Sequence, residues 1–154
     1  MSPIGGSFLV NKKAILVVKE TSAVTAEEWA SQLGEYVDSV YGPGLEKEIY
    51  VLGKGSYSLG PKGMEKIIAK YGTDIIVAFE WVSRMINKQA DFDYFYNLVM
   101  NKGMEFCFSY DKFVWNRNGG LATVAGRVER AEEKSKEKSD NMKMYLNWKK
   151  KHEN

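Results

Sequence analysis

The sequence is poor in the side chains that build cross-links and metal sites. Among its 154 residues, Cys107 is the only cysteine and His152 the only histidine. A lone cysteine cannot form an internal disulfide, which favours a reducing, cytoplasmic compartment. A zinc site of cysteines and histidines is excluded, because it needs more such ligands than the chain has. A histidine-based catalytic triad is disfavoured, and we expect neither a metal nor another cofactor.

The chain also lacks long hydrophobic runs and a strong excess of one charge. No apolar stretch approaches the roughly 20 residues that span a bilayer, and the N-terminus shows no signal-peptide pattern, so we expect no membrane partner. The 22 basic and 20 acidic side chains give a formal net charge of +2. This bias is too weak to imply nucleic-acid binding by itself.

Short apolar runs predict the strands of a sheet. They are residues 14–18, 48–52, 75–79 and 104–108. The length and the β-branched or aromatic content of 14–18, 75–79 and 104–108 are typical of buried strands, and 48–52 is predicted as a short strand. Segments of helical periodicity alternate with them, at 26–40, 61–71 and 91–102. This alternation predicts an α/β domain of three layers with a mainly parallel four-stranded sheet, a mixed sheet being the alternative.

Capping residues mark the predicted helix boundaries. Thr25 and Glu28 have the spacing of a capping box. Pro61 opens the next helix, at a position where its missing N–H costs no hydrogen bond. Lys102 and Gly103 end the third helix, with a cation in the last turn and a glycine beyond it.

Nothing breaks a helix between residues 119 and 151. A helix of roughly 30 residues spans about 45 Å, which a domain with a radius of gyration near 15 Å cannot cover. Apolar side chains return near its end, at Met142, Tyr145, Leu146 and Trp148. We expect this exposed cluster to form the interface of a homodimer or higher oligomer. The predicted organisation is a flexible leader at 1–13, an α/β domain at 14–118 and a dimerisation helix at 119–151.

Several loops and one charged run are candidates for binding. Loops that leave the carboxyl ends of parallel strands commonly carry the site, which directs attention to residues 80–84. Residues 53–60 are rich in glycine and serine but lack the P-loop pattern, and Pro61 removes an N–H donor. Residues 110–118 predict an aromatic loop that either stacks on bases or a partner or covers the end of the sheet. The run 132–140 is typical of a solvated helix face, with a face that tracks DNA as the alternative.

Taken in chain order, these motifs resemble the catalytic domain of the serine recombinases, the resolvase and invertase family. They are the Glu80, Ser83 and Arg84 constellation after a strand, the aromatic helix at 91–99, the Lys-Gly-Met-Glu-Phe segment at 102–106 and the Gly-Gly-Leu segment at 119–121. The resemblance spans residues 14–150 and is densest from 74 to 140. It implies a mixed sheet surrounded by helices. It also implies a long helix that dimerises and, in active members, leads across DNA to a separate DNA-binding domain.

The resemblance also implies where the chemistry of the family would lie. The family cuts DNA with a serine just after its first strand, which makes Ser22 or Thr21 the candidate nucleophile. Its Asp-Arg-x-x-Arg motif is matched by Glu80 as the acid and by Arg84 as the second arginine, a candidate phosphate ligand. The alternative for Arg84 is a surface ion pair with Glu80 or Asp91.

The other phosphate-binding arginines of the family are missing from the matching positions. Val18, Pro61 and Trp81 stand there instead, with Lys62 one position away as a candidate phosphate contact. Lysine is a poor substitute where planar, bidentate contact is needed. Because clustered guanidinium groups offset the charge of a phosphate during its transfer, the pattern predicts a retained fold and lost cleavage.

The favoured function is a catalytically degenerate, serine-recombinase-like protein that acts as a dimeric interaction module in a DNA recombination or DNA-associated context. Any DNA contact is expected to be weak, non-specific and salt-sensitive, with the lysines at 149–151 as candidate contacts. One alternative is an active recombinase domain that uses Ser22 or Thr21 with Arg84. The other is an unrelated α/β binding domain.

Overall fold

The computed structural model describes residues 12–152, so the predicted leader at 1–13 lies outside the described residues except for Lys12 and Lys13. Lys13 is already the first residue of a strand, one residue earlier than the apolar run suggested. The described part has the predicted α/β architecture with a mostly parallel sheet and a long C-terminal helix. None of its helices is both long and apolar enough to cross a membrane.

A single mixed sheet organises the described residues, with strand order β2-β1-β3-β4-β5. Its strands are β1 (Lys13–Val18), β2 (Glu46–Val51), β3 (Ile75–Phe79), β4 (Glu105–Phe108) and β5 (Phe113–Trp115). The first four run parallel, and β5 is antiparallel to β4. The chain first adds β2 on one side of β1 and then adds β3 on the other, so the direction of winding reverses between β1 and β3.

The prediction of four strands is wrong by one, because β5 lies within the segment 110–118 that was interpreted as a loop. Its three residues are too few for an alternating pattern to be recognised. A tight turn joins it to β4, with Lys112 in the left-handed region at φ 54°. The Trp115 ring is 1% exposed and stacks near Phe92, with ring centroids 5.7 Å apart. The segment therefore completes the core. Of the two alternatives, stacking on a partner or covering the end of the sheet, Trp115 covers the sheet.

The helices begin and end close to the predicted positions. They are α2 (Ala26–Tyr41), α3 (Gly60–Tyr71), α4 (Val82–Met85), the 3₁₀ helix η1 (Gln89–Asp91), α5 (Phe92–Lys102) and α6 (Leu121–Lys151). Thr25 caps α2 as predicted, its side-chain oxygen accepting a hydrogen bond from the Glu28 N–H at 3.2 Å. Gly103 ends α5 with φ 72°, a left-handed conformation that glycine adopts without strain. The short helix α4 was not predicted, since four residues show no periodicity.

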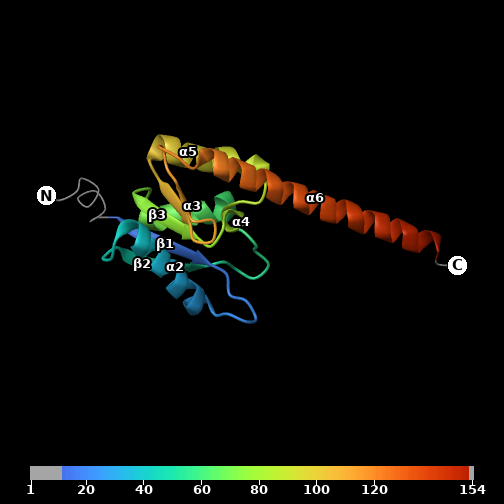
Figure 1. The fold of residues 1–154 in the computed structure, drawn as a ribbon, viewed down its shortest axis with the longest axis horizontal. Coiled ribbons are helices and arrows are strands. Elements are labelled where there is room, and N and C mark those ends of the chain that lie inside the picture. Colours follow the sequence, from blue (N-terminus) through green and yellow to red (C-terminus); the bar gives the residue numbers. More distant parts are fainter. Residues whose placement is uncertain (1–11, 153–154) are drawn as a thin grey trace.

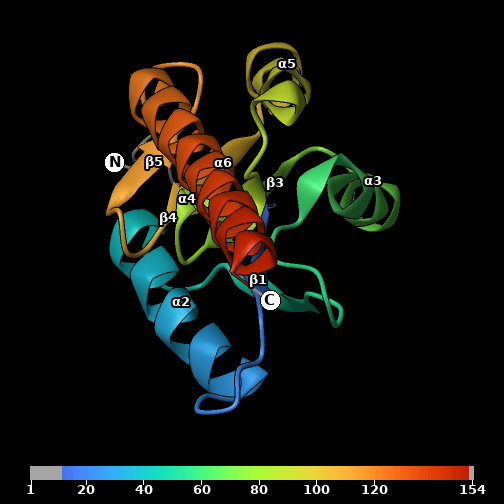
Figure 2. The same ribbon diagram turned by 90° about the vertical axis from the view of Figure 1, so that its right-hand side faces the viewer.

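The helices cover both faces of the sheet (Figure 2). On one face, α2 buries Ala30, Leu33 and Val37 against inward-facing residues such as Leu16. On the other face, side chains from α3, α5 and the start of α6 join a larger aromatic core. Strands β1, β3 and β4 are covered on both faces, which explains why their residues are mostly apolar. The edge strand β2 is largely exposed and carries charged residues.

Helix α6 begins inside the core and then leaves it (Figure 1). Val124 and Val128 are fully buried against the sheet, whereas the apolar side chains beyond residue 140 are exposed. Gly120 immediately precedes α6 and has a positive φ of 95°, which sets the direction in which the helix begins. A Cβ at this position would lie 2.5 Å from the Val114 carbonyl oxygen, so the close approach of β5 and α6 requires glycine.

We predict that Gly120→Ala lowers the free energy of unfolding by about 2 kcal/mol or more, since it adds both a backbone clash and a strained positive φ. Gly119→Ala is the matched control, because a Cβ there meets nothing within 4 Å. Urea unfolding followed by circular dichroism measures both variants. Equal stabilities of the two would show that α6 can leave the core without this close approach.

Candidate functional site

The loops that follow β1 and β3 meet at the carboxyl edge of the sheet, where the winding direction reverses. In open α/β sheets, ligands bind in the crevice at such a reversal. The loop after β3 contains the predicted segment 80–84, and α4 begins within it at Val82. Helix α6 passes over α4, so two elements far apart in the sequence enclose this region.

The candidate nucleophiles lie in the loop after β1, and both are exposed. The Thr21 hydroxyl is engaged in a local turn, where it accepts a hydrogen bond from the Val24 N–H at 3.0 Å. Neither Ser22 nor Thr21 is among the residues that line the cavity between α4 and α6 described below. Lys62, exposed in the first turn of α3, does not line it either.

Arg84 is buried, with 5% of its surface exposed. Its guanidinium carbon lies 4.7 Å from the ring centroid of Tyr57 and 4.8 Å from that of Trp81, so the cation is held between two aromatic rings. Its Nη1 donates a hydrogen bond to the Tyr57 carbonyl oxygen at 3.1 Å. The surface ion pair considered for Arg84 is therefore wrong, and the guanidinium is already engaged by the protein.

Two more aromatic residues contact Trp81. Its ring meets Tyr110 edge-on at 5.3 Å and Trp29 edge-on at 6.4 Å, measured between centroids. Such edge contacts orient an indole because the positive ring edge meets a negative ring face. Trp81, which stands where the resemblance implies an arginine, thus forms part of an aromatic cluster.

Glu80 is the other buried charged residue of this segment, 1% exposed. Neither carboxylate oxygen accepts a hydrogen bond of good geometry within residues 12–152, although the Lys19 backbone lies near. Burial raises the pKa of Glu80 above its ordinary value, and the opposing influences of the Arg84 guanidinium and the Lys19 backbone are smaller. Glu80 therefore holds its proton more tightly than an exposed glutamate does.

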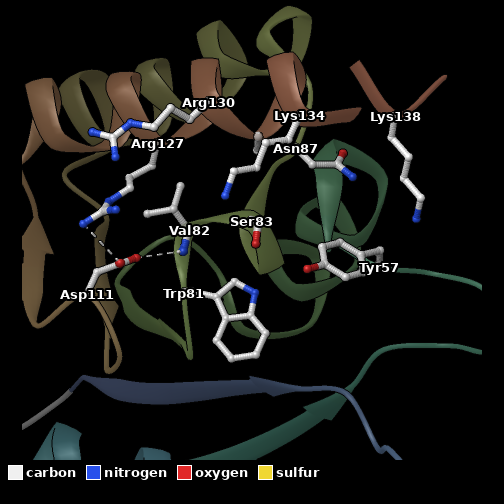
Figure 3. Close-up of a pocket in the computed structure, with 11 residues that line it drawn as sticks. Tyr57, Trp81, Val82, Ser83, Asn87, Asp111, Arg127, Arg130, Lys134 and Lys138 are labelled. Atoms are coloured by element: carbon white, nitrogen blue, oxygen red, sulfur yellow. Dashed lines mark hydrogen bonds and ion pairs between the residues drawn. The ribbon is translucent and has the colours of Figure 1, made fainter. Parts of the chain in front are cut away.

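A cavity of about 620 Å³ lies between α4 and α6. It is lined by Tyr57, Trp81, Val82, Ser83, Asn87, Asp111, Arg127, Arg130, Ala131, Lys134 and Lys138. Figure 3 shows α6 on one side, with Lys134 and Lys138 extending toward the side on which Trp81, Ser83 and Tyr57 lie. The lining thus combines cations from α6 with aromatic and polar groups from the loop before α3, from α4 and its flanking residues, and from the turn between β4 and β5.

The cavity carries an excess of positive charge. Asp111 is the single carboxylate among the described lining residues, and it already makes two contacts. It pairs with Arg127 at 3.5 Å and accepts a hydrogen bond from the Val82 N–H at 3.3 Å. Lys134 and Lys138 form no ion pair with any described residue, nor does Arg130. Such a cavity is suited to an anion.

The sequence contains a pattern of cations that corresponds to one side of this cavity. Arg127, Arg130, Lys134 and Lys138 recur at intervals of three, four and four residues, which places them on one helical face. The run 132–140 predicts a solvated face, or alternatively a face that tracks DNA, and it contains only Lys134 and Lys138 of these four cations. Sorting the charged residues by helical position places these four cations within one face, whereas Glu129 lies on the opposite side of the helix.

Comparisons of the chain with protein-family models, with curated proteins and with solved structures find no match. Its function must therefore be inferred from the residues and from the geometry of the site. Residues 12–152 hold no group of three or more histidine, cysteine, aspartate or glutamate side chains arranged to bind a metal ion.

We predict that Glu80→Gln stabilises the protein increasingly as the pH rises. Because the folded-state pKa of Glu80 lies above its ordinary value of 4.5, its contribution to stability is fully present below that pH. It is lost as the pH rises through the folded-state pKa. Glutamine does not ionise, so the stability of the variant relative to the parent should increase between about pH 4 and about pH 8.

Unfolding midpoints measured across this pH range provide the test. Glu35→Gln, on the exposed side of α2, makes the same chemical change without burial and serves as the control. If the pH profiles of the Glu80 variant and the parent run parallel, burial does not raise the pKa of this carboxyl group.

Proposed function

We propose that this chain is a catalytically degenerate, serine-recombinase-like domain that acts as a dimeric interaction module in a DNA-associated context. One observation carries the loss of cleavage: Arg84, the single arginine retained at a matching phosphate-binding position, is enclosed between Tyr57 and Trp81. A guanidinium held in this way cannot approach a phosphate without breaking both contacts. The mixed sheet and the projecting helix support the resemblance, since both are what it implies.

The remaining positions support the same proposal. Val18 is a fully buried residue of β1, and Pro61 lies in the first turn of α3. Neither side chain can offset the charge of a phosphate. Loss of one preorganised donor typically lowers a rate by about 10²–10³-fold, so the loss of several leaves no useful cleavage.

The distal part of α6 supports self-association. Met142, Tyr145, Leu146 and Trp148 are each more than half exposed. The Tyr145 and Trp148 rings are nearly parallel, with centroids 6.5 Å apart, and together they present a broad apolar surface. An apolar cluster on a helix that leaves the domain is typical of an interface, and a second copy of the same helix is the partner that the resemblance implies.

We predict that the chain forms a dimer at micromolar concentration, with about twice its mass of 17.5 kDa by sedimentation or light scattering. Leu146→Asp should yield a monomer, because it places a charge within the apolar cluster. Asn147→Asp is the matched control, since it adds the same carboxylate one residue away on the opposite helical face. A monomeric parent chain, or equal effects of the two substitutions, would contradict this interface.

We also predict that the chain does not cleave DNA. Incubation with supercoiled DNA, followed by denaturing gels that retain covalent adducts, should show none, because a serine hydroxyl is a poor nucleophile without activation. An adduct that disappears in Ser22→Ala or Thr21→Ala, but persists in Lys62→Ala, would instead support the active-recombinase alternative.

A further inference from the structure

The cavity between α4 and α6 has two chemically different sides. Helix α6 contributes cations, of which Lys134 and Lys138 extend toward the side on which Tyr57 and Trp81 lie (Figure 3). The opposite side offers flat aromatic surface, together with the Ser83 hydroxyl and the Asn87 amide. A ligand that fills the cavity therefore needs an anionic part and a planar part.

The spacing of these cations lowers the stability of the helix. Arg130, Lys134 and Lys138 follow one another at intervals of four residues, and like charges at this spacing destabilise a helix. Pairing with acidic side chains would offset the repulsion, yet none of the three has an ion-pair partner among the described residues. Asp111 provides no relief, because Arg127 and the Val82 N–H already engage it. A bound anion with several oxygens would remove this repulsion.

The aromatic side is held ready to receive a planar group. Arg84 occupies one face of the Tyr57 ring and one face of the Trp81 ring, and 51% of the Tyr57 surface remains exposed. Trp81 is half-buried and is fixed by its edge contacts with Trp29 and Tyr110. Preorganised aromatic side chains bind bases by stacking, a contact that requires an unpaired base with a free face. A base pair within a duplex offers no such face.

We propose that this cavity binds a nucleoside phosphate, either a free nucleotide or one nucleotide of a single strand. Lys134 and Lys138 contact the phosphate, while the base stacks on the exposed Tyr57 ring near the Asn87 amide. The volume of about 620 Å³ falls within the range of about 300–1,000 Å³ typical of small-ligand sites. The site requires neither DNA cleavage nor the distal apolar cluster of α6, so it stands independently of the proposed function.

Proton–nitrogen NMR spectra of the full chain test the site, with AMP as the probe because a purine has a large stacking surface. AMP should shift the Trp81 indole resonance and the backbone resonances of Ser83 and Asn87. Adenosine and ribose 5-phosphate, which each lack one part of the ligand, should bind at least about tenfold more weakly. The Trp148 indole, on the distal part of α6, reports binding elsewhere and should not shift.

Substitutions along α6 locate the phosphate contact. Lys134→Met and Lys138→Met should each weaken AMP binding about tenfold, the effect of removing one charged hydrogen bond. Lys136→Met is the matched control, because this lysine lies between them on the same helix but does not line the cavity. An equal loss in Lys136→Met would show that AMP responds only to the general charge of the helix, and would overturn the proposal.

A single-stranded hexathymidylate distinguishes the two sources of the ligand. Shifts at Trp81 with the oligonucleotide but not with AMP identify a nucleotide within a strand, and the reverse identifies a free nucleotide. No shift at Trp81 with millimolar concentrations of either, or shifts only at Trp148, would refute the site. None of these outcomes would alter the expected dimerisation or the expected absence of cleavage. A failure of the nucleotide site is therefore distinguishable from a failure of the proposed function.

Discussion

The contact of the Arg84 guanidinium with the rings of Tyr57 and Trp81 is the interaction on which the candidate site depends. It joins the loop before α3 to the segment after β3, two parts of the chain that β3 and α3 separate. Two hydrogen bonds strengthen the junction, from Arg84 Nη1 to the Tyr57 carbonyl and from the Leu59 N–H to the Arg84 carbonyl. A buried cation needs such compensation, because its desolvation is costly. The junction fixes both aromatic rings that line the cavity.

Arg84 stands where the resemblance implies a phosphate contact, yet its guanidinium contacts other parts of the protein. In a phosphoryl-transfer site, a guanidinium must be free to meet the developing charge. Here the same group stabilises the packing of two rings, and Trp81 contributes one of them from a position where the resemblance implies an arginine. The cations that do face open space come from α6, so the site best suited to an anion is separate from the candidate nucleophiles.

Helix α6 combines three physical roles along its length. Its first turns are part of the core through Val124 and Val128, and Gly120 permits its close departure from β5. Its middle turns present unpaired cations to the cavity. Its last turns expose apolar side chains far from the sheet, where only another molecule can cover them. A substitution in one part of the helix can therefore be tested with little effect on the other parts, because distant sites contribute almost independently to stability.

The sequence by itself determined the features that depend on neighbouring residues. The buried strand at 75–79 follows from a continuous apolar run, the start of α2 from the Thr25 cap, and the length of α6 from the absence of any helix-breaking residue. These signals are local, because a strand, a cap or a helix is specified within a few residues of its position.

Tertiary structure alone decided the rest. Strand β5 is only three residues long and forms because β4 offers it a hydrogen-bonding edge. The burial of Arg84 depends on Tyr57, which lies 27 residues earlier in the chain. The cavity exists because α6 crosses α4, and no local pattern specifies which residues face each other across that crossing. Periodicity reveals which side chains share one face of a helix, but only packing decides what that face meets.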